Sequence, residues 1–241
     1  MRASKGVAPH RLLKVGGVTP FTATDFPGLL AAVVFVQGCP WRCGYCHNTH
    51  LQSRTPGGTT PWPEVMRFLE RRVGLVDGVV FSGGEPTSDP ALPDAIADAR
   101  ALGFKIGLHS AGTHPRRFER VLPLLDWVGF DVKAPFGNYE RVTRIRDSGA
   151  QARRSLTALL ASGIDYECRT TAHPNLLPDA ELLRLAHRLS EVGVEKYVVQ
   201  VFRKQGSHDE ALNSVGTAGY PSEDTLAALR NAFPIFDVRR G

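Results

Sequence analysis

The chain has 241 residues, of which 42% are hydrophobic and 22% are charged, and its formal net charge is +5 at pH 7. This length suits one large domain with a full core, and the longest purely apolar run, residues 29–36, is too short to cross a bilayer. The arginines are spread over several segments and form no stripe beside aromatic residues, so the composition disfavours a nucleic-acid-binding protein.

Taken in chain order, apolar β-branched runs alternate with patterns of helical period. The predicted strands are residues 30–36, 78–81, 104–108, 127–130, 164–169 and 197–202. The predicted helices are residues 64–72, 90–102, 115–125, 150–162 and 179–192. Six strands with crossover helices match the spacing of a β/α barrel, but an eight-unit barrel needs about 250 residues. The sequence therefore predicts an α/β fold, an incomplete six-stranded parallel (β/α)6 barrel with one open side.

Short elements are expected on both flanks of this barrel. Residues 12–18 predict an extra edge strand, and residues 224–233 and 235–238 predict a last helix and a last edge strand. Residues 205–220 are rich in Gly, Ser and Asn, which is typical of a loop.

The chain is predicted to form one domain, because no linker divides it. This domain covers residues 1–241, with its core at about 17–203 and the C-terminal loop, helix and edge strand at 204–241. No targeting signal is visible in residues 1–20, so we expect a soluble, cytoplasmic protein with no membrane partner.

Three of the four cysteines lie in one short motif, C-x-x-x-C-x-x-C, formed by Cys39, Cys43 and Cys46. Three thiolates on so short a loop can hold one iron–sulfur cluster and leave one iron without a protein ligand. An open coordination position is typical of a site for chemistry rather than of a closed structural site. The fourth, Cys168, is expected to be a small buried hydrophobic residue.

A zinc site is the alternative for the same motif, with His47 as the fourth ligand. Zinc commonly takes two pairs of ligands from separate turns, and His47 directly follows Cys46, so the chain would have to fold back sharply. A disulfide is disfavoured because cytosolic thiols stay reduced.

Polar residues or glycines follow every predicted strand. They are Gln37 and Gly38, the segment 82–86, His109 and Ser110, Asp131 and Lys133, Arg169 with Thr170 and Thr171, and Gln200 with Arg203. The carboxyl ends of parallel strands meet at one end of a barrel, so we expect one ring of ligands there. Any strand that leaves a core ends in polar residues, but charges next to the core, such as Asp131, Lys133 and Arg169, are rarely left without partners.

The cysteine motif also resembles a known family, the radical S-adenosylmethionine (SAM) enzymes, in which an aromatic residue precedes the last cysteine as Tyr45 does here. Residues 25–28, residues 35–48 and the segment Ser82-Gly83-Gly84-Glu85-Pro86 resemble the activating enzymes of glycyl-radical proteins. The similarity is greatest to activators of anaerobic ribonucleoside-triphosphate reductase, and it covers about residues 17–203.

This resemblance implies a [4Fe–4S] cluster on the three cysteines and S-adenosyl-L-methionine beside it. The implied cofactor contacts are Tyr45, then Gly83, Gly84 and Glu85 near the methionine amino group, Asp131 and Lys133 near the ribose, and Arg169 near the carboxylate. No catalytic side chain is implied beyond the cluster and cofactor site. The chain departs from the family at His109-Ser110-Ala111-Gly112, where relatives carry Asp-Thr-Asn-Gly, and at Gln200 and Arg203, where some relatives carry a histidine.

The implied function is that of a radical SAM activase. It would cleave S-adenosylmethionine reductively and remove hydrogen from a backbone glycine of an anaerobic ribonucleotide reductase, with flavodoxin or ferredoxin as electron donor. The Arg-rich residues 141–154 are predicted to form a loop that meets this partner. The alternatives are an activator of another glycyl-radical enzyme, a small-molecule radical SAM enzyme of the deazapurine synthase type, or a zinc- or cluster-containing binding protein without turnover.

Overall fold

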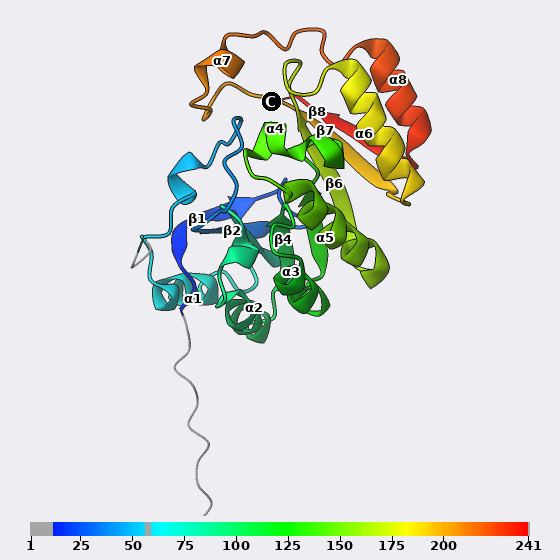
Figure 1. The fold of residues 1–241 in the computed structure, drawn as a ribbon. Helices are drawn as coiled ribbons and strands as arrows, with labels where there is room; N and C mark the ends of the chain where they lie inside the picture. The colour runs from blue at the N-terminus through cyan, green and yellow to red at the C-terminus, as the bar shows by residue number, and fades with distance from the viewer. Residues whose placement is uncertain (1–11, 56–58, 241) are drawn as a thin grey trace, which may run out of the picture.

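The computed structural model describes residues 12–55 and 59–240 and arranges them around one curved sheet (Figure 1). The eight strands are β1 (Val15–Thr22), β2 (Ala31–Val36), β3 (Gly78–Gly83), β4 (Lys105–Ser110), β5 (Trp127–Asp131), β6 (Asp165–Ala172), β7 (Lys196–Val201) and β8 (Ile235–Arg239). They follow one another in the sheet in chain order. The predicted domain at residues 1–241 and the predicted absence of a targeting signal also involve residues 1–11, which lie outside the described residues.

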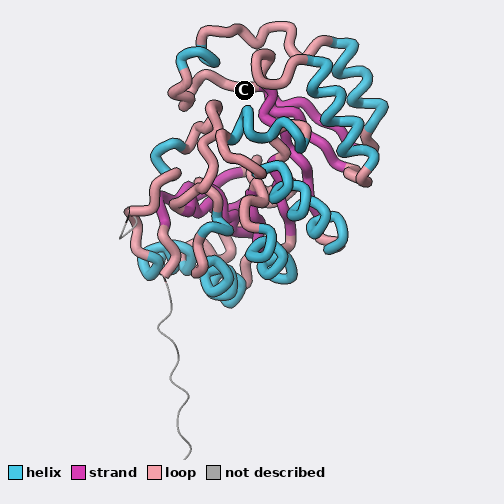
Figure 2. Tube along the Cα trace, in the orientation of Figure 1, coloured by secondary structure: helices cyan, strands magenta, loops and turns pink. Residues whose placement is uncertain are grey.

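Most of the helices lie on the outer side of the sheet, as Figure 2 shows. The helices are α1 (Trp62–Glu70), α2 (Leu92–Ala101), α3 (Pro115–Val121), α4 (Tyr139–Thr143), α5 (Ser148–Ser162), α6 (Asp179–Glu191), α7 (Glu210–Asn213) and α8 (Glu223–Ala232). Four 3-10 helices, η1 (Thr49–Leu51), η2 (Pro86–Ser88), η3 (Leu122–Leu124) and η4 (Phe136–Asn138), connect them. Across the described residues, none of these helices has both the length and the hydropathy needed to cross a membrane.

The strand pairing confirms the incomplete parallel barrel. The six predicted strands are β2 to β7, and all of them pair in parallel. The edge strand β1 is antiparallel to β2, and β8 pairs in parallel with β7. Within the described part of the chain, β1 and β8 stand at opposite ends of the strand order, so the barrel does not close.

Two short helices were not predicted. The segment predicted as a loop at residues 205–220 contains α7, and the predicted loop at residues 141–154 is wrong, because α4 and α5 occupy most of it. Helices as short as α4 and α7 complete too few turns to show a hydrophobic period, so only their tertiary contacts reveal them. Figure 1 shows α7 at the same end of the molecule as α4.

An aromatic plug fills the amino-terminal end of the barrel interior. Phe26 and Trp127 stack with their ring centres 5.6 Å apart and pack with Ala31, Val33 and Val80 into a small cluster separate from the main core. Burial of two such large rings stabilises this end of the barrel and excludes water from it. The space inside the barrel is therefore left at the carboxyl ends of the strands.

Candidate active site

A cavity of about 370 Å³ lies at the carboxyl ends of the strands. It is lined by residues from the loops after β2 to β7, among them Cys39, Cys43, Tyr45, Cys46, Gly83, Gly84, Glu85, Asp131, Lys133 and Arg169. The tertiary structure thus brings every site residue predicted from the sequence to the wall of one cavity. Gln200 and Arg203, where the sequence departs from the family pattern, also line it.

The cysteine loop, residues 39–46, rests on α4. The backbone N–H of Arg42 donates to the carbonyl of Thr143 over 2.9 Å, and the Trp41 ring meets the Tyr139 ring edge-on with centres 5.8 Å apart. Within the loop the N–H of Cys46 donates to the carbonyl of Cys43, which makes the turn that brings these two thiols to the same side. The unpredicted helix α4 is therefore the support of the cysteine loop.

Gly38 fixes the backbone just before the first cysteine. Its φ of +102° lies in the region that favours glycine. The side chain of Arg54 crosses it so closely that a Cβ at this position would lie 2.5 Å from Arg54 Cγ. The guanidinium of Arg54 is anchored in turn by Asp89, at 2.7 Å, and Asp89 is almost completely buried.

The structure does not place His47 as the fourth ligand of a zinc ion. Burial raises the pKa of Cys39 to about 12 and also raises the pKa of Cys43, so bound metal must displace their protons. Within residues 12–55 and 59–240, no group of three or more His, Cys, Asp or Glu side chains is placed to hold one metal ion. His47 Nε2 donates to the carbonyl of Arg203 over 3.0 Å and the His47 ring stacks on Phe202, so this histidine is engaged away from the thiols.

The two glycines of the segment after β3 pack against the chain's own backbone. Gly83 has a φ of +109°, and a Cβ there would lie 2.7 Å from both N and O of Val36. At Gly84 a Cβ would lie 2.6 Å from the carbonyl oxygen of Gly38. The same carbonyl accepts the N–H of Glu85 over 2.8 Å. These glycines therefore join the end of β3 directly to the residue that precedes Cys39.

Glu85 links the ends of β3 and β4. Its side chain is 1% exposed, with Oε1 accepting from Thr87 Oγ1 at 2.6 Å and Ser110 Oγ at 2.8 Å, and Oε2 accepting from the Ala111 N–H at 2.9 Å. Burial raises the pKa of Glu85, while these hydrogen bonds oppose that rise. Because its oxygens are satisfied by the chain's own donors, Glu85 positions the two loops around the cavity.

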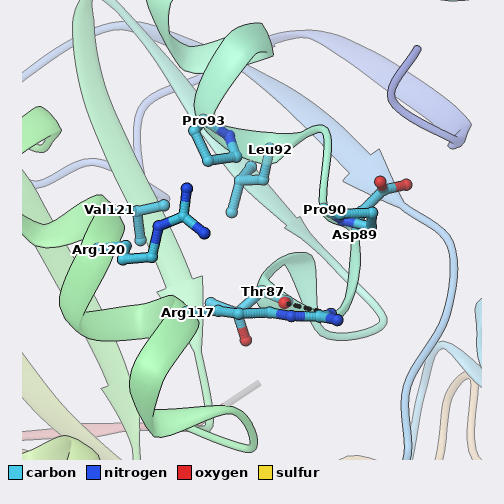
Figure 3. Close-up of a pocket in the computed structure, with 8 residues that line it drawn as sticks. All are labelled: Thr87, Asp89, Pro90, Leu92, Pro93, Arg117, Arg120 and Val121. Carbon is cyan, nitrogen blue, oxygen red and sulfur yellow. Dashed lines mark hydrogen bonds between the residues drawn. The ribbon is translucent and has the colours of Figure 1, made fainter. Parts of the chain in front are cut away.

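A second cavity, of about 50 Å³, lies behind this segment between α2 and α3 (Figure 3). Arg117 lines it, and its Nη1 donates to the carbonyl oxygens of Thr87 at 3.3 Å and Ser88 at 2.7 Å. This guanidinium holds η2, and thereby Glu85, from the outer side of the barrel. No cysteine lines the small cavity. Its Arg117 supports the segment that forms part of the wall of the larger cavity.

A cluster of charges forms the wall opposite Glu85. Arg169 donates through Nε to Asp131 Oδ1 at 3.1 Å and through Nη2 to the carbonyl of Gly129 at 3.2 Å. Lys133 Nζ lies 3.4 Å from Asp131 Oδ2. Burial raises the pKa of Asp131, but Lys133 and Arg169 lower it by more, so the carboxyl is ionised at neutral pH. A Cβ at Gly129 would lie 2.6 Å from Arg169 Cζ, so glycine is what lets the guanidinium lie there.

His109 joins this cluster, a role that the sequence did not assign to it. Its Nε2 donates to the carbonyl of Asp25 over 2.9 Å, so Nδ1 is the acceptor for Ser82 Oγ at 3.2 Å. Burial and the charge of Arg169, 3.2 Å away, lower the pKa of His109 to about 4. The imidazole is therefore neutral at pH 7.

Asp25, Ser82 and Thr171 also line the cavity, but none of them was among the predicted cofactor or metal ligands. A signal for two of them exists in the sequence. Side chains alternate along a strand, so Ser82 shares a face with Val80 of the interior plug, and Thr171 shares a face with Arg169. Asp25 precedes β2 in an irregular segment and carried no periodic signal. Cys168, as expected, is fully buried away from this cavity.

The segment between β7 and α8 covers the cysteine loop from another side. A Cβ on Gly44 would lie 3.0 Å from Asp209 Oδ2 and 3.7 Å from Leu212 Cδ1. Asp209 also pairs with Arg144 at 3.4 Å, and the carbonyl of Leu212 accepts from His173 Nε2 at 3.1 Å. Residues near α7 and α4 thus enclose the loop that carries the three thiols.

Comparisons with known proteins agree with this site. The model of the radical SAM superfamily matches residues 33–189. A protein of Methanocaldococcus jannaschii, named after the glycyl-radical enzyme activating enzymes, is 27% identical over 89% of this chain and 89% of its own length. The pyruvate formate-lyase-activating enzyme of Clostridium pasteurianum is 31% identical over 50% of this chain and 52% of its own length.

The fold recurs in a solved structure, that of Streptococcus suis SuiB bound to the precursor peptide SuiA. It superposes with a TM-score of 0.62 at 15% identity, over 86% of this chain and 48% of the SuiB chain. At this identity the likeness concerns the fold alone. The match of the family model extends from β2 to α6 and includes the cysteine loop and the polar ends of β3 to β6. The chain therefore belongs to the radical SAM superfamily and is an enzyme that uses a [4Fe–4S] cluster and S-adenosylmethionine.

Proposed function

We propose that this enzyme activates a glycyl-radical protein, and that its partner is an anaerobic ribonucleotide reductase. The observation that carries the proposal is a cavity with three thiols and a charged wall at the mouth of a barrel that stays open between β1 and β8. An open side suits a substrate that is itself a protein segment. Similarity to the Methanocaldococcus jannaschii protein over most of both chains supports an activase of this kind.

In this proposal Cys39, Cys43 and Cys46 hold the cluster, and the rest of the cavity holds S-adenosylmethionine. When bound, these cofactors supply the one-electron chemistry that removes a hydrogen atom from the substrate. Arg169 and Lys133 present two positive charges to the cavity against the single carboxylate of Asp131, which favours the carboxylate end of the cofactor. The protein's part is to bind, orient and exclude water.

Supporting residues keep these groups in place. Neutral His109 donates a hydrogen bond to the carbonyl of Asp25 and so connects the charged wall to that residue. The carboxylate of Glu85 accepts from the Ala111 N–H and so connects the ends of β3 and β4. The stacked rings of Phe26 and Trp127 close the end of the barrel interior that lies opposite the carboxyl ends of the strands. Preorganised groups of this kind cost little reorganisation when the reaction occurs.

The test is radical formation in the partner. Anaerobically reconstituted and reduced protein is mixed with S-adenosylmethionine and an anaerobic ribonucleotide reductase, and electron paramagnetic resonance is recorded. A glycyl radical in the reductase is the expected result. Flavodoxin or ferredoxin should be able to replace the chemical reductant in this assay. We also propose that the protein is cytoplasmic, because thiols stay reduced in that compartment. A radical in another glycyl-radical enzyme alone would change the partner, and cofactor cleavage without any protein radical would favour a small-molecule substrate.

Arg169→Lys should weaken S-adenosylmethionine binding by about 1–3 kcal/mol while the cluster remains intact. Lysine keeps the charge but cannot keep both the Asp131 contact and the Gly129 contact that the planar guanidinium makes. The measurement is calorimetric binding of S-adenosylmethionine to the reconstituted protein. Arg100→Lys, on an exposed arginine that pairs with Asp126, is the matched control. Equal affinity in all three proteins would return Arg169 to a structural role.

We propose that the protein partner docks on the exposed arginines that follow α4, Arg144 and Arg146. Arg144 lies next to the cysteine loop and pairs with Asp209, whereas Arg154 in α5 pairs with Glu119. Arg146, in the turn between α4 and α5, is exposed and has no ion pair in the part of the chain that the structure describes. We take Arg144 and Arg146, at the end of α4 and in the turn that follows it, as the partner contacts to be tested.

Arg146→Glu should slow glycyl-radical formation severalfold at low salt and reduce its salt sensitivity, because exposed charges act mainly on association. S-adenosylmethionine cleavage without the partner should be unchanged, since Arg146 does not line the cavity. Arg153→Glu, the same charge change farther along in α5, is the control. Radical formation at the same rate in both variants would mean that Arg146 is only a solvated surface charge.

A further inference from the structure

Lys133 is a buried cation beside the cysteine loop. Its side chain is 12% exposed, and Nζ lies 5.5 Å from the centre of the Tyr45 ring, which stands between Cys43 and Cys46 in the loop. An ammonium group has three donors. Among the described residues, the single acceptor of Nζ is Asp131 Oδ2, at the long distance of 3.4 Å. Most of its hydrogen-bonding capacity is therefore directed at the cavity that it shares with the cysteines.

The position of Lys133 is coupled to that of the cysteine loop. The backbone N–H of Lys133 donates to Tyr139 Oη at 3.0 Å. The ring of Tyr139 is the same ring that supports Trp41 of the cysteine loop. The backbone of Lys133 and the cysteine loop therefore rest on one buried side chain, that of Tyr139.

Two positive charges meet one carboxylate on the wall of the cavity that carries Lys133. Lys133 and Arg169 share the carboxylate of Asp131, and His109 is neutral at pH 7. Burial lowers the pKa of Lys133, but its neighbours, Tyr45, Asp131, Cys43 and Tyr139, raise it by more, so the group stays charged. Two further carboxylates line the cavity. Glu85 lies on the side of Cys39 and is satisfied by its own donors, and Asp25 Oδ2 accepts from Thr22 Oγ1 at 2.6 Å.

We propose that Lys133 raises the reduction potential of the cluster held by the three cysteines and thereby makes its one-electron reduction easier. The inference rests on the proposed cluster site. The step concerned would be the transfer of one electron from a low-potential one-electron donor to the bound cluster, with no bond or proton exchanged. A fixed positive charge in a poorly solvated site stabilises the more negative, reduced state because little water screens it.

This role differs from the ribose contact that the family resemblance implies for Lys133. A residue that only holds S-adenosylmethionine does not affect the cluster before the cofactor binds. The potential of the cluster in the absence of S-adenosylmethionine therefore separates the two roles.

The experiment measures the midpoint potential of the reconstituted full chain without S-adenosylmethionine, by redox titration followed by electron paramagnetic resonance. Lys133→Met should lower the equilibrium constant for reduction at least tenfold, which is about 59 mV for a one-electron couple. Lys133→Arg should retain most of the wild-type potential. Lys105→Met, which removes an equally charged but exposed lysine at the other end of the barrel, should leave it unchanged.

Asp131→Asn gives a second test in the opposite direction, because removal of the opposing carboxylate should raise the potential. If Lys133→Met fails to fold, Lys133→Gln, which also removes the charge, takes its place. Iron and sulfide content are measured for every variant. Wild-type protein that binds no cluster would overturn the proposed site itself, whereas loaded variants with the wild-type potential would overturn only the role of Lys133.

Discussion

Replacement of any one of Cys39, Cys43 or Cys46 by alanine is expected to abolish stable binding of the [4Fe–4S] cluster. All three thiols line one cavity on a loop held by Gly38 and α4, and two remaining thiolates cannot retain a cluster that already has one iron without a protein ligand. Cys168→Ala is the matched control, because Cys168 is fully buried away from the cavity. This variant should bind the cluster as the wild type does.

Iron and sulfide analysis of anaerobically reconstituted protein provides the measurement. The wild type and Cys168→Ala should bind about four irons and four sulfides per chain, the composition of a [4Fe–4S] cluster. The alanine variants of the loop should bind close to none. Zinc in place of iron in protein isolated without oxygen would contradict the assignment, and so would full loading of any of the three loop variants.

Gly83→Ala is expected to lower the free energy of unfolding of the apo protein by about 3 kcal/mol or more. Two effects add at this position. An alanine is strained at a φ of +109°, and its Cβ would lie 2.7 Å from backbone atoms of Val36, which belongs to a central strand and cannot move aside cheaply. Denaturant unfolding of the wild type and the variant gives the difference.

Gly103→Ala separates strain from the close contact. Gly103 has a φ of +91°, but a Cβ there would meet nothing within 4 Å. Backbone strain alone should cost about 1–2 kcal/mol. If Gly83→Ala destabilised the protein no more than Gly103→Ala does, the direct packing of β3 on β2 at this point would not hold in solution.

The sequence predicted those strands and helices in which hydrophobic residues form a continuous run or recur with a regular period. The six strands from β2 to β7 and the helices between them follow from apolar runs and helical patterns, which depend only on neighbouring residues. The same holds for the cysteine loop and for Asp131, Lys133 and Arg169, because a residue that follows a parallel strand must lie at the carboxyl end of the sheet.

The sequence could not predict which hydrogen bonds the cavity residues form with one another. The sequence assigned Glu85 and Arg169 to the cofactor, and the structure adds contacts that the sequence did not predict: Glu85 is bonded to Ser110 and Ala111, and Arg169 to Asp131 and Gly129. These partners lie 25 to 40 residues apart in the chain. No local pattern encodes which of the strand-end residues will meet.

The sequence by itself therefore determined the class of fold, the three thiols and the ring of polar residues around them, because these depend on spacing along the chain. Only the tertiary structure decided that α4 supports the cysteine loop, that His47 is engaged by Arg203, and that Lys133 lies beside Tyr45. Such contacts depend on strand register and on helices too short to leave a periodic signal, and both are fixed by packing between segments far apart in the chain.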